Sequence, residues 1–162
     1  MDTVEVITAL GGGVAHSVIE RAEGSCSETS IVFVERRNLV RDCLARALRA
    51  MCPNYAISGF ATTEEWLASA DRHRRADLVL LGGSDTASNT ELERQVVAIR
   101  RGAEAAPLVL VSDREDATFI LDAIKIGARG VIPTSLPMEV AISAIRLVLA
   151  GGAFVPAAAL IS

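Results

Sequence analysis

The chain has 162 residues, of which 51% are hydrophobic, so it can fold as one domain with a real buried core. Its formal net charge of −4 argues against a nucleic-acid-binding surface on this segment, because such surfaces are strongly basic. No stretch of about 18 apolar residues lacks a charged residue, which argues against a membrane-spanning helix and a membrane partner.

The cysteines and the N-terminus predict a reduced, cytoplasmic protein. The chain has an odd number of cysteines, and their spacing is not that of metal ligands, so neither a disulfide framework nor a metal site is expected. The three are Cys26, Cys43 and Cys52. Asp2 and Glu5 stand where a secretory signal would carry basic residues.

Residues 1–29 are predicted to be an N-terminal extension and linker. Residues 4–10 have the composition of a short strand, and three glycines separate them from a short helical pattern at 14–22. The polar stretch 23–30 then has the composition of a linker.

From residue 30 onward, short apolar runs alternate with amphipathic helical patterns. Strands are predicted at 31–34, 55–60, 78–81, 107–111 and 130–132. Helices are predicted at 39–51, from Thr62 or Thr63 to the basic run 72–75, at 92–103, at 119–127 and from Ser135 or Pro137 to about 150. Apolar strands alternating with such helices indicate an α/β fold, a five-stranded parallel sheet in the flavodoxin-like order, with helices on both faces.

In such sheets ligands bind beyond the carboxyl ends of the strands, so any site is expected just after Val34, Leu81 and Val111. The turn Gly82–Gly83–Ser84 follows the third strand and offers backbone N–H groups for an anion. Its glycines are equally typical of a tight strand-to-helix turn, and that interpretation is favoured because the longer phosphate-binding fingerprint is missing.

Four segments resemble the receiver domains of response regulators. Residues 31–41 are similar to the opening of such a domain, and residues 76–81 to its third strand. Residues 127–137 and 147–152 are similar to the fifth strand and last helix of LuxR-type transcription regulators. The resemblance spans about residues 30–156 and implies the CheY-like form of the three-layer α/β/α fold.

In that family a phosphoryl group is transferred to an aspartate at the end of the third strand. Two acids after the first strand hold Mg²⁺, and a hydroxyl after the fourth strand and a lysine after the fifth bind the phosphoryl oxygens. An aromatic residue on the fifth strand reports the change. Phosphoryl transfer depends on such convergence, because it is mostly positioning and charge neutralisation.

The positions that correspond to this centre in the present chain are Glu35, Arg36, Gly82, Ser112, Val131 and Thr134. The acid pair becomes Glu35 and Arg36, and the acceptor becomes Gly82, which has no side chain. Only the hydroxyl, at Ser112, is retained besides one acid. The resemblance therefore implies a phosphorylation-deficient receiver in which the Arg36 guanidinium repels a metal ion and pairs with Glu35, holding the site in one state.

Two other acids lie near the predicted edge. Asp85, in the loop 82–89, is displaced from the acceptor position and is interpreted as a turn or capping residue. Asp113 follows Ser112 and is expected to cap the fourth helix. The basic run 72–75 is interpreted as a solvated helix end.

The last helix has an apolar surface wider than one stripe. The resemblance implies dimerisation through such a helix, and the candidate interface residues are Val140, Ile142, Leu147 and Leu149.

The sequence thus predicts a non-catalytic signalling and dimerisation module of a response-regulator transcription factor, acting without aspartyl phosphorylation and without a cofactor. Residues 157–162 are expected to begin a linker to a helix-turn-helix domain, through which alone the parent protein would contact DNA. The alternatives are a stand-alone adaptor that binds a kinase or another regulator, and an anion-binding or small-molecule-binding module. No nucleophile–base pair in the sequence suggests an enzyme.

Overall fold

The computed structural model describes residues 28–69, 75–83 and 88–160. The strands are β1 (Thr29–Val34), β2 (Tyr55–Phe60), β3 (Leu78–Gly82), β4 (Leu108–Ser112) and β5 (Gly130–Pro133). The helices are α1 (Asn38–Met51), α2 (Thr63–Leu67), α4 (Asn89–Gly102), α5 (Ala117–Lys125), α6 (Met138–Leu149) and the short 3-10 helix η2 (Ala157–Leu160).

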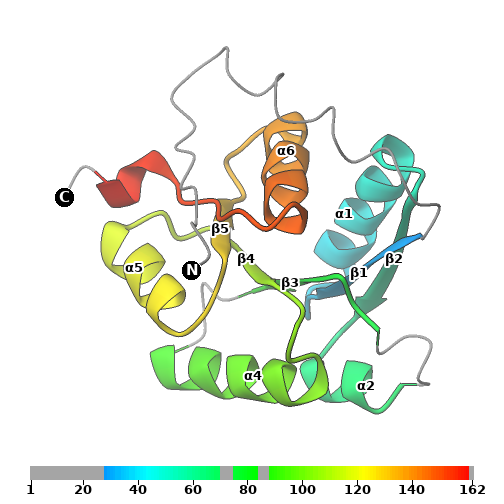
Figure 1. The fold of residues 1–162 in the computed structure, drawn as a ribbon, viewed down its shortest axis with the longest axis horizontal. Coiled ribbons are helices and arrows are strands. Elements are labelled where there is room, and N and C mark those ends of the chain that lie inside the picture. The colour runs from blue at the N-terminus through cyan, green and yellow to red at the C-terminus, as the bar shows by residue number, and fades with distance from the viewer. Residues whose placement is uncertain (1–27, 70–74, 84–87, 161–162) are drawn as a thin grey trace.

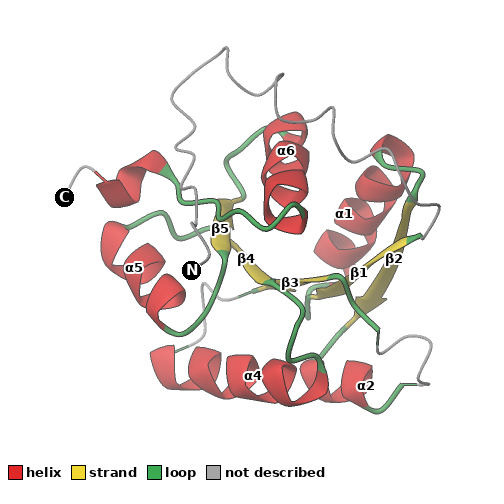
Figure 2. Ribbon diagram, in the orientation of Figure 1, coloured by secondary structure: helices red, strands yellow, loops and turns green. Residues whose placement is uncertain are grey.

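The strands form one parallel sheet in the order β2-β1-β3-β4-β5. Helices α1 and α6 lie on one face of the sheet, and α2, α4 and α5 lie on the other (Figure 1). Figure 2 shows the resulting three layers, with the strands between two layers of helices. The predicted flavodoxin-like fold is confirmed.

Period-2 alternation along β1 divides the core in two. Ile31 and Phe33 pack with α1 and α6, whereas Val32 and Val34 pack with α2, α4 and α5. Trp66, on α2, is fully buried in the second of these cores. The sheet is therefore covered on both faces, which is why its strands have continuous apolar sequences.

Polar side chains cap three of the helices. Thr62, Ser88 and Asp116 each accept a hydrogen bond from a backbone N–H in the first turn of α2, α4 and α5. Helix α2 ends at Leu67, earlier than expected, because the Ser69 hydroxyl and backbone N–H both donate to the Trp66 carbonyl.

The segment after α6 packs on the domain, including part of the stretch in which a linker was expected to begin. Phe154 forms a parallel bridge with Gly130 on the outer edge of β5. A Cβ at Gly130 would lie 2.7 Å from the Phe154 carbonyl oxygen, so this close approach needs glycine. Helix η2 then packs on α5, with Ala159 buried among the residues of that core. Packing against the domain thus continues at least to Ala159.

Several expectations concern residues outside the described ranges. They are the extension up to residue 27, Cys26, the basic residues 72–74, and Ser84 and Asp85 in the loop after β3. Of the two remaining cysteines, Cys52 is buried and Cys43 is exposed. In the described ranges, no helix is both long enough and apolar enough to span a membrane.

Candidate functional site

The register of the parallel strands brings the predicted site residues to one edge of the sheet. Val34 pairs with Leu81, Gly82 with Val111, and Ser112 with Pro133. The residues that follow these pairs, among them Glu35 and Thr134, therefore leave the sheet side by side. The convergence expected from the sequence is present.

The carboxylate of Glu35 is buried at this edge, and Glu35 is only 1% exposed. Its Oε1 accepts from the backbone N–H of Arg37 at 2.8 Å and from Arg37 Nε at 3.1 Å, and its Oε2 accepts from Arg37 Nη2 at 3.1 Å. A two-residue turn of this kind directs the Arg37 side chain back over the carboxylate. The partner of Glu35 is thus Arg37 and not Arg36, which is exposed and forms no hydrogen bond or ion pair with a described residue.

Gly82 lies directly against this carboxylate. A Cβ at position 82 would be 2.3 Å from Glu35 Oε2 and 3.3 Å from Phe33 Cε2, so no side chain fits there while Glu35 stays in place. Gly83 follows with a φ of +70°, and a Cβ there would be 3.4 Å from Glu35 Oε1. The glutamate carboxylate occupies the space beyond β3, and the two glycines make room for it.

Arg37 extends the site to the loops after β4 and β5. Its Nη1 lies 3.5 Å from Asp113 Oδ2, and Asp113 Oδ1 accepts a hydrogen bond from the Thr134 hydroxyl. Next to this contact the Ser135 hydroxyl donates to Glu115. Three loops, from three strands, are therefore connected by side chains.

Asp113 does not cap α5. That role belongs to Asp116, whose carboxylate accepts from the Phe119 N–H at 2.9 Å. This hydrogen bond, supported by Arg114, lowers the pKa of Asp116 below its ordinary value. The loop between β4 and α5 is long enough for Asp113 to turn toward Arg37 instead.

Ser112 and Val131 are fully buried. The Ser112 hydroxyl accepts from the Arg114 N–H at 3.0 Å and so stabilises the turn after β4. Val131 packs in the same core as Phe119 on α5. Ser112 stabilises the turn at the edge, Val131 fills the core, and neither presents a reactive group to solvent.

Comparison with known proteins gives no matching family model and no matching curated protein. Solved structures do match. A LuxR-family DNA-binding response regulator from Silicibacter pomeroyi has 26% identity and a TM-score of 0.66, covering 79% of this chain and 97% of that one. A LuxR-family two-component response regulator from Aurantimonas sp. SI85-9A1 has 25% identity and a TM-score of 0.66, covering 79% and 89%. The isolated REC domain of RcsB from Salmonella enterica serovar Typhimurium has 9% identity and a TM-score of 0.68, covering 83% and 97%.

The fold is that of a response-regulator receiver domain. The predicted resemblance to receiver domains of the LuxR family is thereby confirmed.

The edge of this receiver does not fit the Mg²⁺ ion that the resemblance implies. Mg²⁺ needs oxygen ligands that include one or two carboxylates. Both Glu35 oxygens already accept from Arg37, whose positive charge lies beside them, and Gly82 offers no oxygen from a side chain. In the described ranges no three His, Cys, Asp or Glu side chains are grouped to hold a metal ion.

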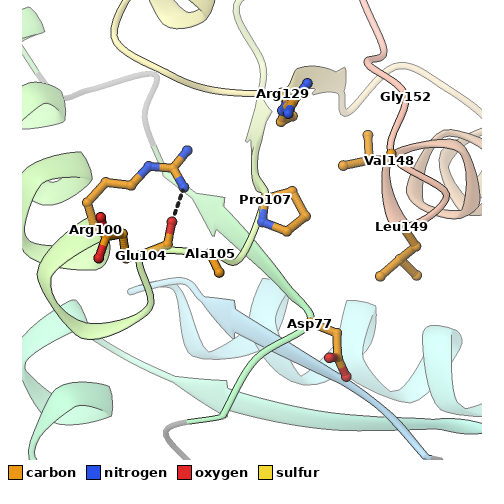
Figure 3. A pocket seen from close by; sticks show the side chains of 10 residues that line it. Asp77, Arg100, Glu104, Ala105, Pro107, Arg129, Val148, Leu149 and Gly152 are labelled. Carbon is orange, nitrogen blue, oxygen red and sulfur yellow. Dashed lines mark hydrogen bonds between the residues drawn. The ribbon is translucent and has the colours of Figure 1, made fainter. Parts of the chain in front are cut away.

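A pocket of about 350 Å³ lies at the opposite, amino end of the receiver sheet (Figure 3). Two of the polar side chains that line it are engaged in hydrogen bonds to the backbone. The Arg100 guanidinium donates to the carbonyl oxygens of Ala106 and Gly127, both at 2.8 Å, and Asp77 accepts from the Ser30 N–H at 2.8 Å. The carboxyl edge is therefore the better candidate for function.

The dimer candidates on α6 are not equivalent. Ile142 is 4% exposed and belongs to the core between α6 and the sheet, so it cannot form part of a surface. Val140, Leu147 and Leu149 are half-buried. Sequence reasoning also missed Arg37, although a second arginine directly after Arg36 was the visible signal for it.

Proposed function

We propose that this receiver domain works as a non-catalytic signalling module that does not accept a phosphoryl group on an aspartate. The observation that carries the proposal is the contact between Gly82 and Glu35. The acceptor position has no side chain, and the space for one is filled by a buried carboxylate. Receiver domains in general are signalling domains, and we propose that this one passes its signal through contact with other proteins.

Incubation with acetyl phosphate and MgCl₂, followed by intact-mass spectrometry, tests this proposal. We expect an unchanged mass, while a receiver with a complete acid cluster, treated in parallel, gains one phosphoryl group. A phospho-adduct stable at neutral pH, mapped to any aspartate of the chain, would contradict the proposal.

We further propose that the domain belongs to a cytoplasmic transcription regulator and self-associates through α6. Val140, Leu147 and Leu149 are the residues proposed for this surface, with Ile142 now assigned to the core. A helix-turn-helix domain outside this segment would supply the DNA contacts.

Sedimentation equilibrium tests the self-association, and we expect Val140→Glu to weaken the dimer. Leu121→Glu, on α5 and 45% exposed, is the matched control on the opposite face of the sheet. Monomers at all concentrations in the unmodified chain would contradict this part.

The anion-binding alternative is disfavoured by the same site. The Glu35 carboxylate lies against Gly82 and Gly83, so it fills the space that an anion on the glycine turn would need. In the adaptor alternative the domain binds a kinase or another regulator. Its site would work without a phosphoryl group, as in the main proposal, and the two differ only in the output of the parent protein.

A further inference from the structure

We propose that the Arg37 side chain supplies the positive charge at the carboxyl edge of the sheet. We further propose that its ion pairs form a latch between loops, which other ions open by competing for the exposed contact. The Arg37 latch comprises Glu35, Arg37, Asp113 and Thr134. This inference rests on the proposed function, because it says how the loops of a receiver that uses neither a phosphoryl group nor a metal ion are held together and released.

The inner half of the latch is strong. Glu35 is 1% exposed and receives three hydrogen bonds from Arg37, two of them from the guanidinium. Charge-assisted bonds to a buried carboxylate are stronger than neutral ones, and the carboxylate cannot be left without its partner at low cost. Arg37 is therefore anchored on the β1–α1 loop and carries a fixed positive charge to the mouth of the site.

The outer half is weak by comparison. Nη1 of Arg37 and Oδ2 of Asp113 are 3.5 Å apart, and the two side chains are 42% and 50% exposed. Exposed ion pairs of this kind stabilise little and are screened by salt. The latch therefore opens between Arg37 and Asp113, while Arg37 remains on Glu35.

Opening the outer contact releases more than one side chain. Asp113 also accepts from the Thr134 hydroxyl, so the loops after β4 and β5 move as one unit. One residue further on, Arg114 donates its N–H to the buried Ser112 hydroxyl and stacks its guanidinium over the Phe119 ring, 4.4 Å from the centroid. Phe119 is buried in α5, the helix on which η2 packs. The latch is thus connected to the C-terminal segment through contiguous contacts.

Hydrogen–deuterium exchange tests the latch, with Asp113→Asn as the main variant because Asp113 is half exposed and its loss does not disturb the Glu35–Arg37 pair. We expect exchange of the amides in 113–116 and 134–136 to rise about two- to fivefold, the range that corresponds to losing an exposed ion pair. Amides of β3 are expected to be unchanged. Arg37→Gln should raise exchange in the same two segments at least as much.

Arg36→Gln is the matched control, since it removes an equal charge from the neighbouring position without touching the latch. Raising NaCl from about 0.1 M to about 1 M shortens the Debye length from about 10 Å to about 3 Å. The unmodified chain should then exchange faster in both segments, whereas Asp113→Asn should respond less. Normal protection in Asp113→Asn, or equal loss of protection in Arg36→Gln, overturns the latch. The mass test with acetyl phosphate is independent of exchange, so failure of the proposed function would be recognised separately.

Discussion

Replacement of Gly82 by alanine tests how the carboxyl edge is packed. The new Cβ would lie 2.3 Å from Glu35 Oε2, far inside van der Waals contact, and 3.3 Å from the Phe33 ring. Phe33 is fully buried, so the carboxylate must move. Moving it strains or breaks its bonds to Arg37. Overpacking of a core costs about 1–3 kcal/mol, and loss of a buried ion-pair partner costs about 3–5 kcal/mol. Because the Arg37 side chain is 42% exposed and can follow a displaced carboxylate, part of the ion pair is kept, and we expect Gly82→Ala to lower the free energy of unfolding by about 2–4 kcal/mol.

Urea unfolding followed by circular dichroism measures this loss. Gly59→Ala is the control, because it adds the same methyl group to a strand glycine that faces the flexible side chain of Arg41 at 3.2 Å. That variant should change stability by less than about 1 kcal/mol. In the double variant Glu35→Ala/Gly82→Ala the colliding group is gone, so the two losses should not add. Strict additivity, or a Gly82→Ala variant as stable as the unmodified chain, would refute the proposed packing.

Three further predictions concern the scaffold. Arg100→Ala removes three hydrogen bonds to carbonyl oxygens and should lower the free energy of unfolding by about 1–2 kcal/mol in urea, while Arg101→Ala, at an exposed neighbour, should not. Phe154→Ala removes a side chain that is 6% exposed beside β5, and we expect the free energy of unfolding to fall by about 3 kcal/mol in the same assay. An unchanged urea midpoint would mean that this segment does not pack on β5. The lowered pKa of Asp116 stabilises the fold above the ordinary pKa of 3.8, and this contribution is lost as pH falls through the lowered value. The free energy of unfolding of Asp116→Asn should therefore depend less on pH in acid than that of the unmodified chain. An equal pH dependence of the two proteins would mean that the Phe119 N–H does not bond to Asp116.

The sheet was predictable from sequence because its strands are buried on both faces. Residues 78–81 and 107–111 have no polar member, which in a chain of this length is typical of central parallel strands. Once the strands are parallel, their carboxyl ends must share one edge. The position of Glu35 and Gly82 in the site follows from that geometry alone.

The partner of Glu35 was not predictable in the same way. Two arginines follow it, and the choice between them depends on a backbone turn in which the N–H of Arg37 donates to the carboxylate two residues earlier. Nothing in side-chain periodicity specifies such a turn. The burial of Glu35 itself could have been inferred, because period-2 alternation along β1 places it on the same side as Phe33.

The C-terminal segment shows a second limit. Residues 155–160 are apolar, half of them alanine, and contain a proline, a composition shared by linkers and by segments that pack on a helix. The structure distinguishes these through long-range contacts, the bridge from Phe154 to Gly130 and the burial of Ala159 against the core that includes α5. Local sequence carries no signal for a partner almost 25 residues earlier in the chain.

Glu35, Arg37 and Gly82 depend on one another for both space and charge. A carboxylate at position 82 would lie against the buried carboxylate of Glu35, and two such groups in contact cannot both stay ionised without a strong cation between them. Removing the side chain at 82 leaves one carboxylate, which a single guanidinium can neutralise. Arg37 supplies that charge from within the chain and extends it to Asp113. Because this cation is a side chain of the loop, its presence does not depend on a bound metal ion. The contact with Asp113 is the exposed part of this arrangement, and it is the part that the proposed latch would open.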